Sequence, residues 1–522
     1  MQLTVRPQIT IAVVDARNRL EPEIRRRRRR WVRWRHFVSR TRDRAASGLT
    51  PLASTDTGHT GTEWAVRARD SPELVVDFRI SRDSRDDRQG GKLITEAFYG
   101  MKSRESWLVG CSTGGRQGLA EAQRYPDDYN GIVSGAPAID WQRLLLSGRW
   151  NSEATLKDPD SYIPPSKLLA INNATIAACD AIDGVKDGLV ADGRQCKFDP
   201  VAIACQNGDS PNCLTAKQTD ALKKIYAGSR DADGRQIYPG LLPGVERGWG
   251  AFTTGQERER SLDHFFSSGY MKYFVYQDAN WDPMTFDFAK DLATVDEGSE
   301  EPRMALETMN SDLKPFRDRG GKLILYHGWG DDAISPLNTI NYYKMVVDKT
   351  TGGPKAADAW APRMRSSIRR RRRPASSCGS SVVPGMNHCG GGPGPNTFDA
   401  VTALSNWVEK KQAPDVLMGS HVTNGTTGSH SSALSVSPGG EVFRSGRRDS
   451  DAANFRCSNY ELDLCVSAVP VARSSPSTGT QLNLHVLEID RLVWMPRRGG
   501  AIQFANLPGS TTRPCIMAWT KV

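Results

Sequence analysis

The stretch SWLVGCSTGGRQGLAEAQRY, residues 106–125, decides the fold class because its pattern changes twice. The apolar run at 106–110 has the length and composition of a short buried strand, and the glycine-rich turn after it ends that strand. From Arg116 onward the apolar residues follow helical spacing. The stretch therefore predicts a strand, a tight turn and a helix in immediate succession.

Two later apolar runs also stand directly before polar loops. KLILYHG, residues 322–328, leads into a loop that carries Asp331, and SVVPG, residues 381–385, leads into a loop that carries His388. Strands that each end in such a loop are typical of a mostly parallel sheet with helices between its strands. We therefore expect an α/β fold.

The turn between the first strand and its helix contains the motif G-x-S-x-G, in which Gly110 and Gly114 flank Ser112. In this motif the serine occupies a strained turn, and the glycines are needed because a Cβ would collide with neighbouring backbone. An ordinary glycine turn is the alternative, but the preceding strand and the following helix supply the context that the motif requires. We predict that Ser112 is a nucleophile.

A serine hydroxyl is a poor nucleophile at neutral pH, so it needs an imidazole to accept its proton and a carboxylate to orient that imidazole. On this fold the acid and then the histidine follow the serine, each on a loop after a strand. Asp331 and His388 meet both conditions, and we predict that they complete a triad with Ser112. Asp332 is the alternative acid. His327 is the rival base, although its place beside the acid loop favours a role in supporting that turn.

Cysteines stand beside two members of this triad, because Cys111 precedes the serine and Cys389 follows the histidine. If serine and histidine approach within about 3 Å, the adjacent backbones are close enough for a disulfide, whose Cα atoms lie roughly 5 to 6 Å apart. Two unpaired buried thiols are the alternative. We predict a bridge between Cys111 and Cys389 that holds the nucleophile against the base.

Four further cysteines bracket two loops. Cys179 and Cys196 enclose an acidic loop, Cys205 and Cys213 enclose a short polar loop, and the sequence has no C-x-x-C pair with zinc spacing. Disulfides are therefore favoured over metal ligands, and they imply an oxidising compartment.

An oxidising compartment implies secretion, but the first 20 residues lack the continuous apolar segment of a signal peptide. Tripeptides of the form N-x-T at Asn173 and Asn424 are candidate glycosylation acceptors. We expect a secreted glycoprotein whose signal peptide is not recognisable in this sequence.

The composition limits the kinds of partner that the protein can have, membranes and nucleic acids included. The hydrophobic fraction of 38% is typical of globular proteins, and no apolar run approaches the roughly 18 residues that span a bilayer. The formal charge of +10 arises from arginine runs at 25–30 and 369–373, and without these eleven residues it is −1. Such blocks are usually solvated, and neither is interleaved with aromatic residues and glycines as in RNA-binding modules. We expect no membrane segment and no nucleic-acid partner.

The length of 522 residues exceeds the size of a single core, so we expect an inserted domain. The stretch after Asp140 shows no βαβ rhythm, and we interpret it as a lid. The predicted organisation is a divergent N-terminal segment outside the domain (1–52), a catalytic core (53–140 and 317–414), a lid (141–316) and a divergent Ser/Gly-rich region (415–522).

The lid sequence CDAIDGVKDGL, residues 179–189, crowds acidic residues between glycines that permit sharp turns. Hard oxygen ligands in one loop suit calcium. The loop is not an EF-hand because it lacks the glutamate at the twelfth position, and a solvated acidic turn is the alternative. The predicted ligands are three carboxylates and two backbone carbonyls, from Asp180, Asp183, Asp187, Val185 and Leu189.

Together these motifs resemble the tannase and feruloyl esterase family. The resemblance rests on GCSTGGRQGL, HGWGDDAISP and PGMNHCGGGPGPNTFD, with support from ASTDTGHTG and IVSGAPAIDW, and covers about residues 54–414 with gaps. It implies an α/β-hydrolase fold with a large inserted lid, the same triad, a disulfide between the two cysteines beside it, and a structural calcium ion in the lid loop. It also implies a serine carboxylic ester hydrolase that acts through an acyl-enzyme on plant phenolic-acid esters of feruloyl or galloyl type, including polysaccharide-linked ones.

One departure from the family leaves a second hypothesis open. Before Ala53 the family has a glycine-rich turn that supplies an oxyanion-hole amide, and this chain has an arginine-rich stretch there. The backbone N–H of Thr113 remains as the predicted oxyanion donor, and losing one donor costs on the order of 10² to 10³ in rate. A catalytically impaired family member that acts as a carbohydrate-binding or scaffold protein is therefore the alternative to an active enzyme.

Overall fold

The computed structural model describes most of the chain between residues 92 and 435 and several short strands outside it. The described residues are 92–93, 95–97, 100–298, 306–351, 378–414, 416–423, 426–435 and the strands at 9–13, 52–55, 441–444, 455–458, 466–468, 485–489 and 517–521. Both arginine runs and Asn424 lie outside the described residues. No helix within these ranges is long and apolar enough to cross a membrane.

Eight strands form the main sheet in the order β13-β1-β2-β14-β3-β4-β5-β6. The predicted strands at 106–110, 322–328 and 381–385 correspond to β3, β5 and β6. The bounds of the eight strands, in sheet order, are His485–Ile489, Ile9–Val13, Leu52–Thr55, Met517–Lys521, Glu105–Cys111, Gly131–Gly135, Lys322–Gly328 and Cys378–Val383.

The two halves of this sheet differ in direction. Strands β3 to β6 pair in parallel, as expected for the strands that carry the site. Strands β13, β1, β2 and β14 pair antiparallel, and β14 joins the halves by pairing antiparallel with β3. Strand β1 lies in the segment that we predicted to stand outside the domain, and β13 and β14 lie in the divergent C-terminal region. Both flanking regions therefore contribute strands to the sheet.

Two smaller sheets use the same C-terminal region. One has the order β12-β9-β8-β7, and the other pairs β10 with β11. The bounds of β7 to β12 are Thr397–Phe398, Val416–Thr423, Thr426–Ser435, Glu441–Arg444, Phe455–Ser458 and Val466–Ala468.

Helices cover both faces of the parallel half. Successive strand residues point to opposite faces, so Leu108 and Ile132 pack with α5 and α13, while Trp107 and Val133 pack with α15. Helix α5 spans Thr113–Arg124, α12 Lys314–Asp318, α13 Pro336–Thr351 and α15 Ala400–Lys410. These layers fix the ends of β3, β5 and β6, from which the candidate site projects.

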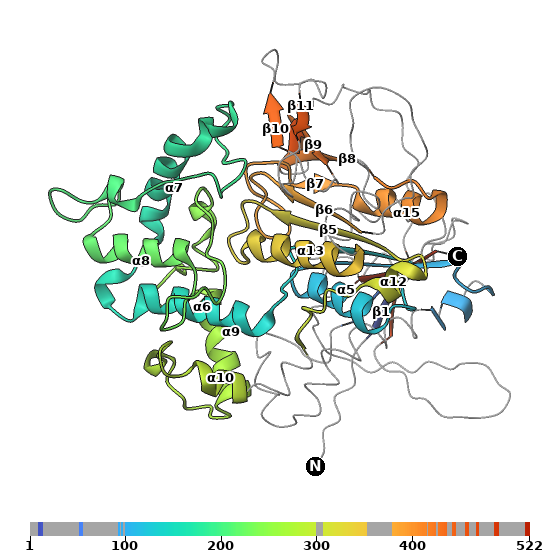
Figure 1. The fold of residues 1–522 in the computed structure, drawn as a ribbon, viewed down its shortest axis with the longest axis horizontal. Coiled ribbons are helices and arrows are strands. Elements are labelled where there is room, and N and C mark those ends of the chain that lie inside the picture. The colour runs from blue at the N-terminus through green and yellow to red at the C-terminus, as the bar shows by residue number, and fades with distance from the viewer. Residues whose placement is uncertain are drawn as a thin grey trace.

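The chain between β4 and β5 forms a helical lobe beside the sheet, at the left of Figure 1. It has two apolar clusters of its own, one around Tyr270 and Phe274 and the other around Ile171 and Trp249. Its α-helices are α6 (Trp141–Leu156), α7 (Pro165–Cys179), α8 (Ala216–Ala227), α9 (Leu262–Tyr270) and α10 (Leu292–Gly298). The lobe occupies the stretch that we interpret as a lid, and this interpretation stays a prediction.

Candidate active site

Ser112 lies between the last residue of β3 and the first residue of α5. Its backbone has φ 62° and ψ −123°, a conformation that residues other than glycine rarely adopt. The Ser112 N–H donates to the carbonyl of Gly135 at the end of β4 (2.9 Å), which holds the turn in place. A Cβ on Gly110 would lie 2.3 Å from the carbonyl oxygen of Gly114. Only glycine fits there, as the motif predicts.

The predicted oxyanion donor Thr113 is the first residue of α5. The first N–H groups of a helix have no acceptor in their own helix, and the helix dipole makes this end positive. Among the described residues, the Thr113 N–H donates to no protein acceptor. The group is therefore available to the oxyanion that forms when the serine adds to a carbonyl group, whereas the arginine-rich stretch before Ala53, where the family has its second donor, lies outside the described residues.

The loops after β5 and β6 lie against each other. The Trp329 N–H donates to the carbonyl of Val383 (2.7 Å), and a Cβ on Gly328 would lie 2.0 Å from the carbonyl oxygen of Met386. This close backbone contact brings the acid and the histidine together although they are 57 residues apart in sequence.

Asp331 is fully buried, and both of its carboxylate oxygens have partners. Oδ1 accepts hydrogen bonds from the N–H groups of Ala333 (2.9 Å) and Ile334 (2.8 Å). Oδ2 lies 2.9 Å from Nδ1 of His388. The two backbone donors fix the plane of the carboxylate, so that its other oxygen faces the imidazole.

His327 contacts the same oxygen of Asp331 from the other side. Its Nε2 lies 3.0 Å from Asp331 Oδ2 and 3.0 Å from the carbonyl of Ile334, and both are acceptors. Nε2 therefore carries the proton, and Nδ1 accepts from the hydroxyl of Thr339 (2.9 Å). This agrees with the expectation that His327 supports the acid loop, and its direct contact with the carboxylate was not predicted.

The pKa values of the acid and the base move in opposite directions. Burial by itself would raise the pKa of Asp331, but the facing imidazoles of His388 and His327 outweigh it and lower that pKa. Burial would lower the pKa of His388, but the charge and hydrogen bond of Asp331 outweigh it and raise that pKa. The pair therefore stabilises the imidazolium that forms when the histidine accepts a proton.

Asp332, the alternative acid, is placed differently. Its backbone carbonyl accepts from the hydroxyl of Thr253 in the lid (3.3 Å), and its side chain packs against Gly248. Burial and the neighbouring Asp331 raise the pKa of its carboxyl group. The structure thus sets Asp331, and not Asp332, against the ring of His388.

The predicted bridge between Cys111 and Cys389 is present, with its Cα atoms 5.8 Å apart. It joins the residue before Ser112 to the residue after His388, and so ties the turn after β3 to the loop after β6. Ser112 and His388 do not form a hydrogen bond with each other in the described structure. Such contacts are often long before substrate binds, and the disulfide limits how far the two side chains can separate.

The lid contributes one aromatic residue that the sequence analysis missed. The ring of Phe252 meets the ring of His388 edge to face, with centroids 5.4 Å apart. No spacing or motif distinguishes this phenylalanine from others in the lid, so only the packing of lid on core reveals it. The lid therefore forms part of the wall beside the predicted base.

Comparison with known proteins identifies the family of the chain. A model of the family described as tannase and feruloyl esterase matches residues 42–458. The chain belongs to the tannase and feruloyl esterase family. The match extends beyond the residues 54–414 that carry the motifs, and it includes Cys457. The protein is accordingly a carboxylic ester hydrolase.

Individual relatives show how far the similarity extends. The probable feruloyl esterase B-1 of Aspergillus terreus is 30% identical over 387 residues, which cover 70% of this chain and 68% of that protein. The mono(2-hydroxyethyl) terephthalate hydrolase of Piscinibacter sakaiensis is 30% identical over 420 residues, covering 71% and 66%. The crystal structure of feruloyl esterase B from Aspergillus oryzae superposes with a TM-score of 0.66 at 26% identity, covering 78% of each chain.

In this family member the predicted calcium loop is closed by a disulfide between Cys179 and Cys196, with Cα atoms 5.3 Å apart. One carboxylate oxygen of Asp180 accepts from the N–H groups of Asp187 (3.1 Å) and Gly188 (3.1 Å). Asp183 and Asp187 likewise accept from the N–H groups of residues 185 and 189. Carboxylate oxygens suit a hard cation as ligands. In this structure, however, each of these carboxylates accepts hydrogen bonds from backbone N–H groups of the same loop.

The carboxylates of this loop do not form a cluster in this structure. Within the described ranges, the only three metal-ligating side chains whose atoms lie within 4.8 Å of one another are Cys205, Asp209 and Cys213. The carboxylates at 180, 183 and 187 are therefore not gathered around one point. Calcium binding by this loop stays a prediction, and it requires those side chains to turn.

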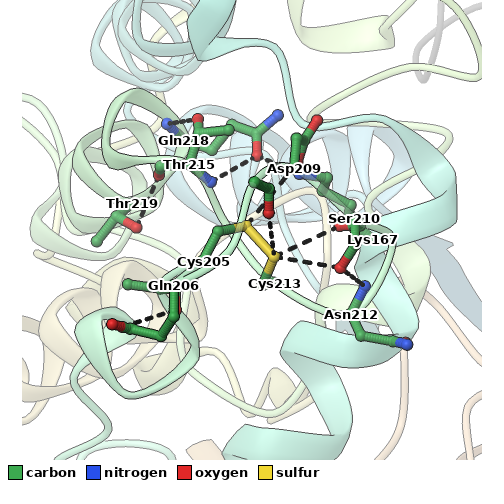
Figure 2. Close-up of a disulfide and its surroundings, with 12 residues drawn as sticks. Lys167, Cys205, Gln206, Asp209, Ser210, Asn212, Cys213, Thr215, Gln218 and Thr219 are labelled. Atoms are coloured by element: carbon green, nitrogen blue, oxygen red, sulfur yellow. Dashed lines mark hydrogen bonds and ion pairs between the residues drawn. A yellow bond between two sulfur atoms is a disulfide. The ribbon is translucent and has the colours of Figure 1, made fainter.

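The group at Cys205 and Cys213 is the third predicted disulfide, with Cα atoms 4.9 Å apart. Figure 2 shows Asp209 beside it, reaching the ammonium of Lys167. Lys167 is almost completely buried and also donates to Oε1 of Gln218 (2.6 Å). Since both sulfurs are joined, the group offers no thiolate to a metal, and we interpret it as a structural link between this loop, α7 and α8.

Proposed function

We propose that the protein hydrolyses phenolic-acid esters, of feruloyl or galloyl type, through an acyl-enzyme on Ser112. The relatives named as feruloyl esterases support the substrate class. The side chains around the elbow support the chemistry, because Ser112, Asp331 and His388 follow one another in the order of nucleophile, acid and base that such hydrolases use.

In the proposed mechanism, His388 Nε2 accepts the proton of Ser112 Oγ as this oxygen attacks the ester carbonyl. The Thr113 N–H donates to the oxyanion of the tetrahedral intermediate. His388 then gives the proton to the departing alcohol, which leaves an acyl group on the serine. A water molecule gives a proton to the same imidazole as it attacks that acyl group. The imidazolium then returns the proton to Ser112 Oγ as the bond between acyl carbon and serine breaks, which releases the carboxylic acid and the free serine.

The observation that carries this proposal is the contact of 2.9 Å between His388 Nδ1 and Asp331 Oδ2, tied to the strained serine turn by the bridge between Cys111 and Cys389. If the contact between His388 and Asp331 were only structural, a disulfide next to a serine at positive φ would not be needed. Nor would that contact need the unused N–H of Thr113 beside the serine. A serine, a histidine oriented by a carboxylate and a free N–H beside the serine are what acyl transfer requires.

The choice between feruloyl and galloyl esters is tested by measuring methyl ferulate and methyl gallate hydrolysis side by side with the purified protein. Ring hydroxyls discriminate strongly when a site is built to hydrogen-bond them. We expect one of the two esters to be preferred by at least about 10²-fold in kcat/KM. Absence of turnover with both esters would contradict the proposed function and favour the scaffold hypothesis.

We also propose that the protein works in an oxidising compartment and is secreted. Three disulfides support this, because such bonds persist where thiols are not kept reduced. Of the two glycosylation candidates, Asn173 is exposed on α7, but Thr175 of the same tripeptide is buried and donates to the carbonyl of Ile171 (2.9 Å). Glycosylation at Asn173 therefore has to occur before α7 packs.

A further inference from the structure

A cavity of about 230 Å³ lies in the lid, lined by residues of α6 and α8 and of the short 3-10 helix Pro159–Ser161. None of the triad residues lines it. Figure 1 shows that α6 and α8 belong to the helical lobe beside the sheet. The cavity is therefore separate from the candidate active site.

One wall of this cavity is aromatic and held in place. The indole N–H of Trp150 donates to the carbonyl of Lys224 on α8 (2.9 Å), and its ring meets that of Phe288 edge to face at 5.0 Å. Ala154, one turn further along α6, leaves room beside the indole. A fixed indole next to a small residue offers a flat apolar surface to a ligand.

The second wall carries the carboxylate side chain of Glu153. Oε1 of Glu153 is buried and accepts no hydrogen bond from the described residues. Behind it lies the fully buried guanidinium of Arg149, whose Nε is 3.9 Å away and whose nitrogens donate to no acceptor within the described ranges. These atoms are enclosed by protein, so they lie behind the wall, and Glu153 meets the cavity with the rest of its side chain.

The remaining charges around the cavity balance. Lys157 lies 3.5 Å from Glu153 Oε2, and Asp158 accepts from the ammonium of Lys217 (2.5 Å). The ammonium of Lys224 makes no hydrogen bond or ion pair with the described residues. Two lysines and two carboxylates thus line the cavity, so it offers hydrogen-bond donors and hydrogen-bond acceptors.

We propose that this cavity binds a neutral sugar unit of the polysaccharide to which the ester substrate is attached. A sugar ring presents an apolar CH face to an indole and hydroxyl groups that both donate and accept, and the cavity offers all three kinds of contact. Its volume is below that of drug-sized pockets, which suits a single ring. The assignment rests on the proposed function, since it names the alcohol side of that substrate.

The test uses xylotriose, a neutral oligosaccharide without an ester, titrated calorimetrically into the full chain. We expect saturable binding that Lys224→Met weakens about tenfold, the scale of one lost hydrogen bond to a charged group. The matched control is Lys223→Met, because this neighbouring lysine on α8 pairs with Asp199 (3.5 Å) and does not line the cavity. Both variants should hydrolyse methyl ferulate at the wild-type rate.

A second readout uses the polymer. With a feruloylated xylan fragment as substrate, Lys224→Met should raise KM and leave kcat unchanged, while Lys223→Met should change neither. No saturable binding of xylotriose to the wild type, or equal losses in the two variants, would overturn the sugar site. If the wild type fails to hydrolyse methyl ferulate, the proposed function fails instead, whatever xylotriose does.

Discussion

The acid loop at residues 328–335 and the lid loop at residues 179–189 both carry closely spaced aspartates beside glycines, yet they use their carboxylates differently. In the acid loop the backbone takes one oxygen of Asp331 and leaves the other aimed at two histidines. In the lid loop Asp180 accepts two N–H groups of its own loop. The comparison shows two conditions under which a carboxylate contacts a residue far away in sequence. Backbone N–H groups of its own loop hold one oxygen, and a loop after a neighbouring strand places the partner next to the other oxygen.

The largest difference between the two loops should appear when their carboxylates become amides. Asp331→Asn should lower kcat by about 10⁴, because an amide does not hold the imidazole in the tautomer that accepts the serine proton. Asp183→Asn in the lid loop is the control and should leave kcat on methyl ferulate unchanged. A greater loss in Asp332→Asn than in Asp331→Asn would show that the acid is misassigned.

Removing the disulfide of one region should mainly lower activity, and removing that of the other should mainly lower stability. Replacing Cys111 and Cys389 by serine should lower kcat about 10²-fold, because a misplacement of about 1 Å between catalytic groups has that effect. Replacing Cys179 and Cys196 by serine should leave kcat unchanged and lower the free energy of unfolding by roughly 3 kcal/mol, as expected for a loop of this length. Turnover and thermal unfolding, measured on both double variants, check this. Full activity without the first bridge would show that the clamp is dispensable.

The same comparison explains what the sequence could and could not predict. The places of Ser112, Asp331 and His388 in the fold were predictable because each follows an apolar strand, and parallel strands bring such positions to one edge of the sheet. The contact of Phe252 with His388 was not, since it depends on how the lid packs on the core. Nor was the pairing of β14 with β3, which joins residues about 400 positions apart without a strong strand pattern. The carboxylate directions in the lid loop depend on local backbone turns that spacing alone does not specify.

The pH dependence of turnover should show the raised pKa of His388. Only the neutral imidazole accepts the serine proton, so kcat/KM should fall about tenfold per unit as the pH drops below that pKa. The charge of Asp332 contributes to raising it. In a pH profile with methyl ferulate, Asp332→Asn should therefore shift the acid limb to lower pH with little loss at neutral pH. An unshifted or upward-shifted limb would contradict this electrostatic account.

Calcium should have the smallest effect, confined to the lid loop. If the ion binds only the folded state, a concentration ten times its Kd stabilises the fold by about 1.4 kcal/mol. The melting temperature should rise with calcium and fall with a chelator, while kcat stays constant. Asp180→Asn should abolish the rise. Identical melting curves with calcium and with chelator would contradict calcium binding by the lid loop.

The most direct test of the central claim is labelling with a fluorophosphonate, which reacts with a serine only when a base and an oxyanion site activate it. Intact-protein mass spectrometry should show one adduct, located by digestion on the peptide that contains Ser112. Ser112→Ala should take up no label and should not hydrolyse methyl ferulate, while it melts like the wild type. A folded Ser112→Ala variant that keeps its turnover, or an adduct at another serine, would contradict the assignment of Ser112 as the nucleophile.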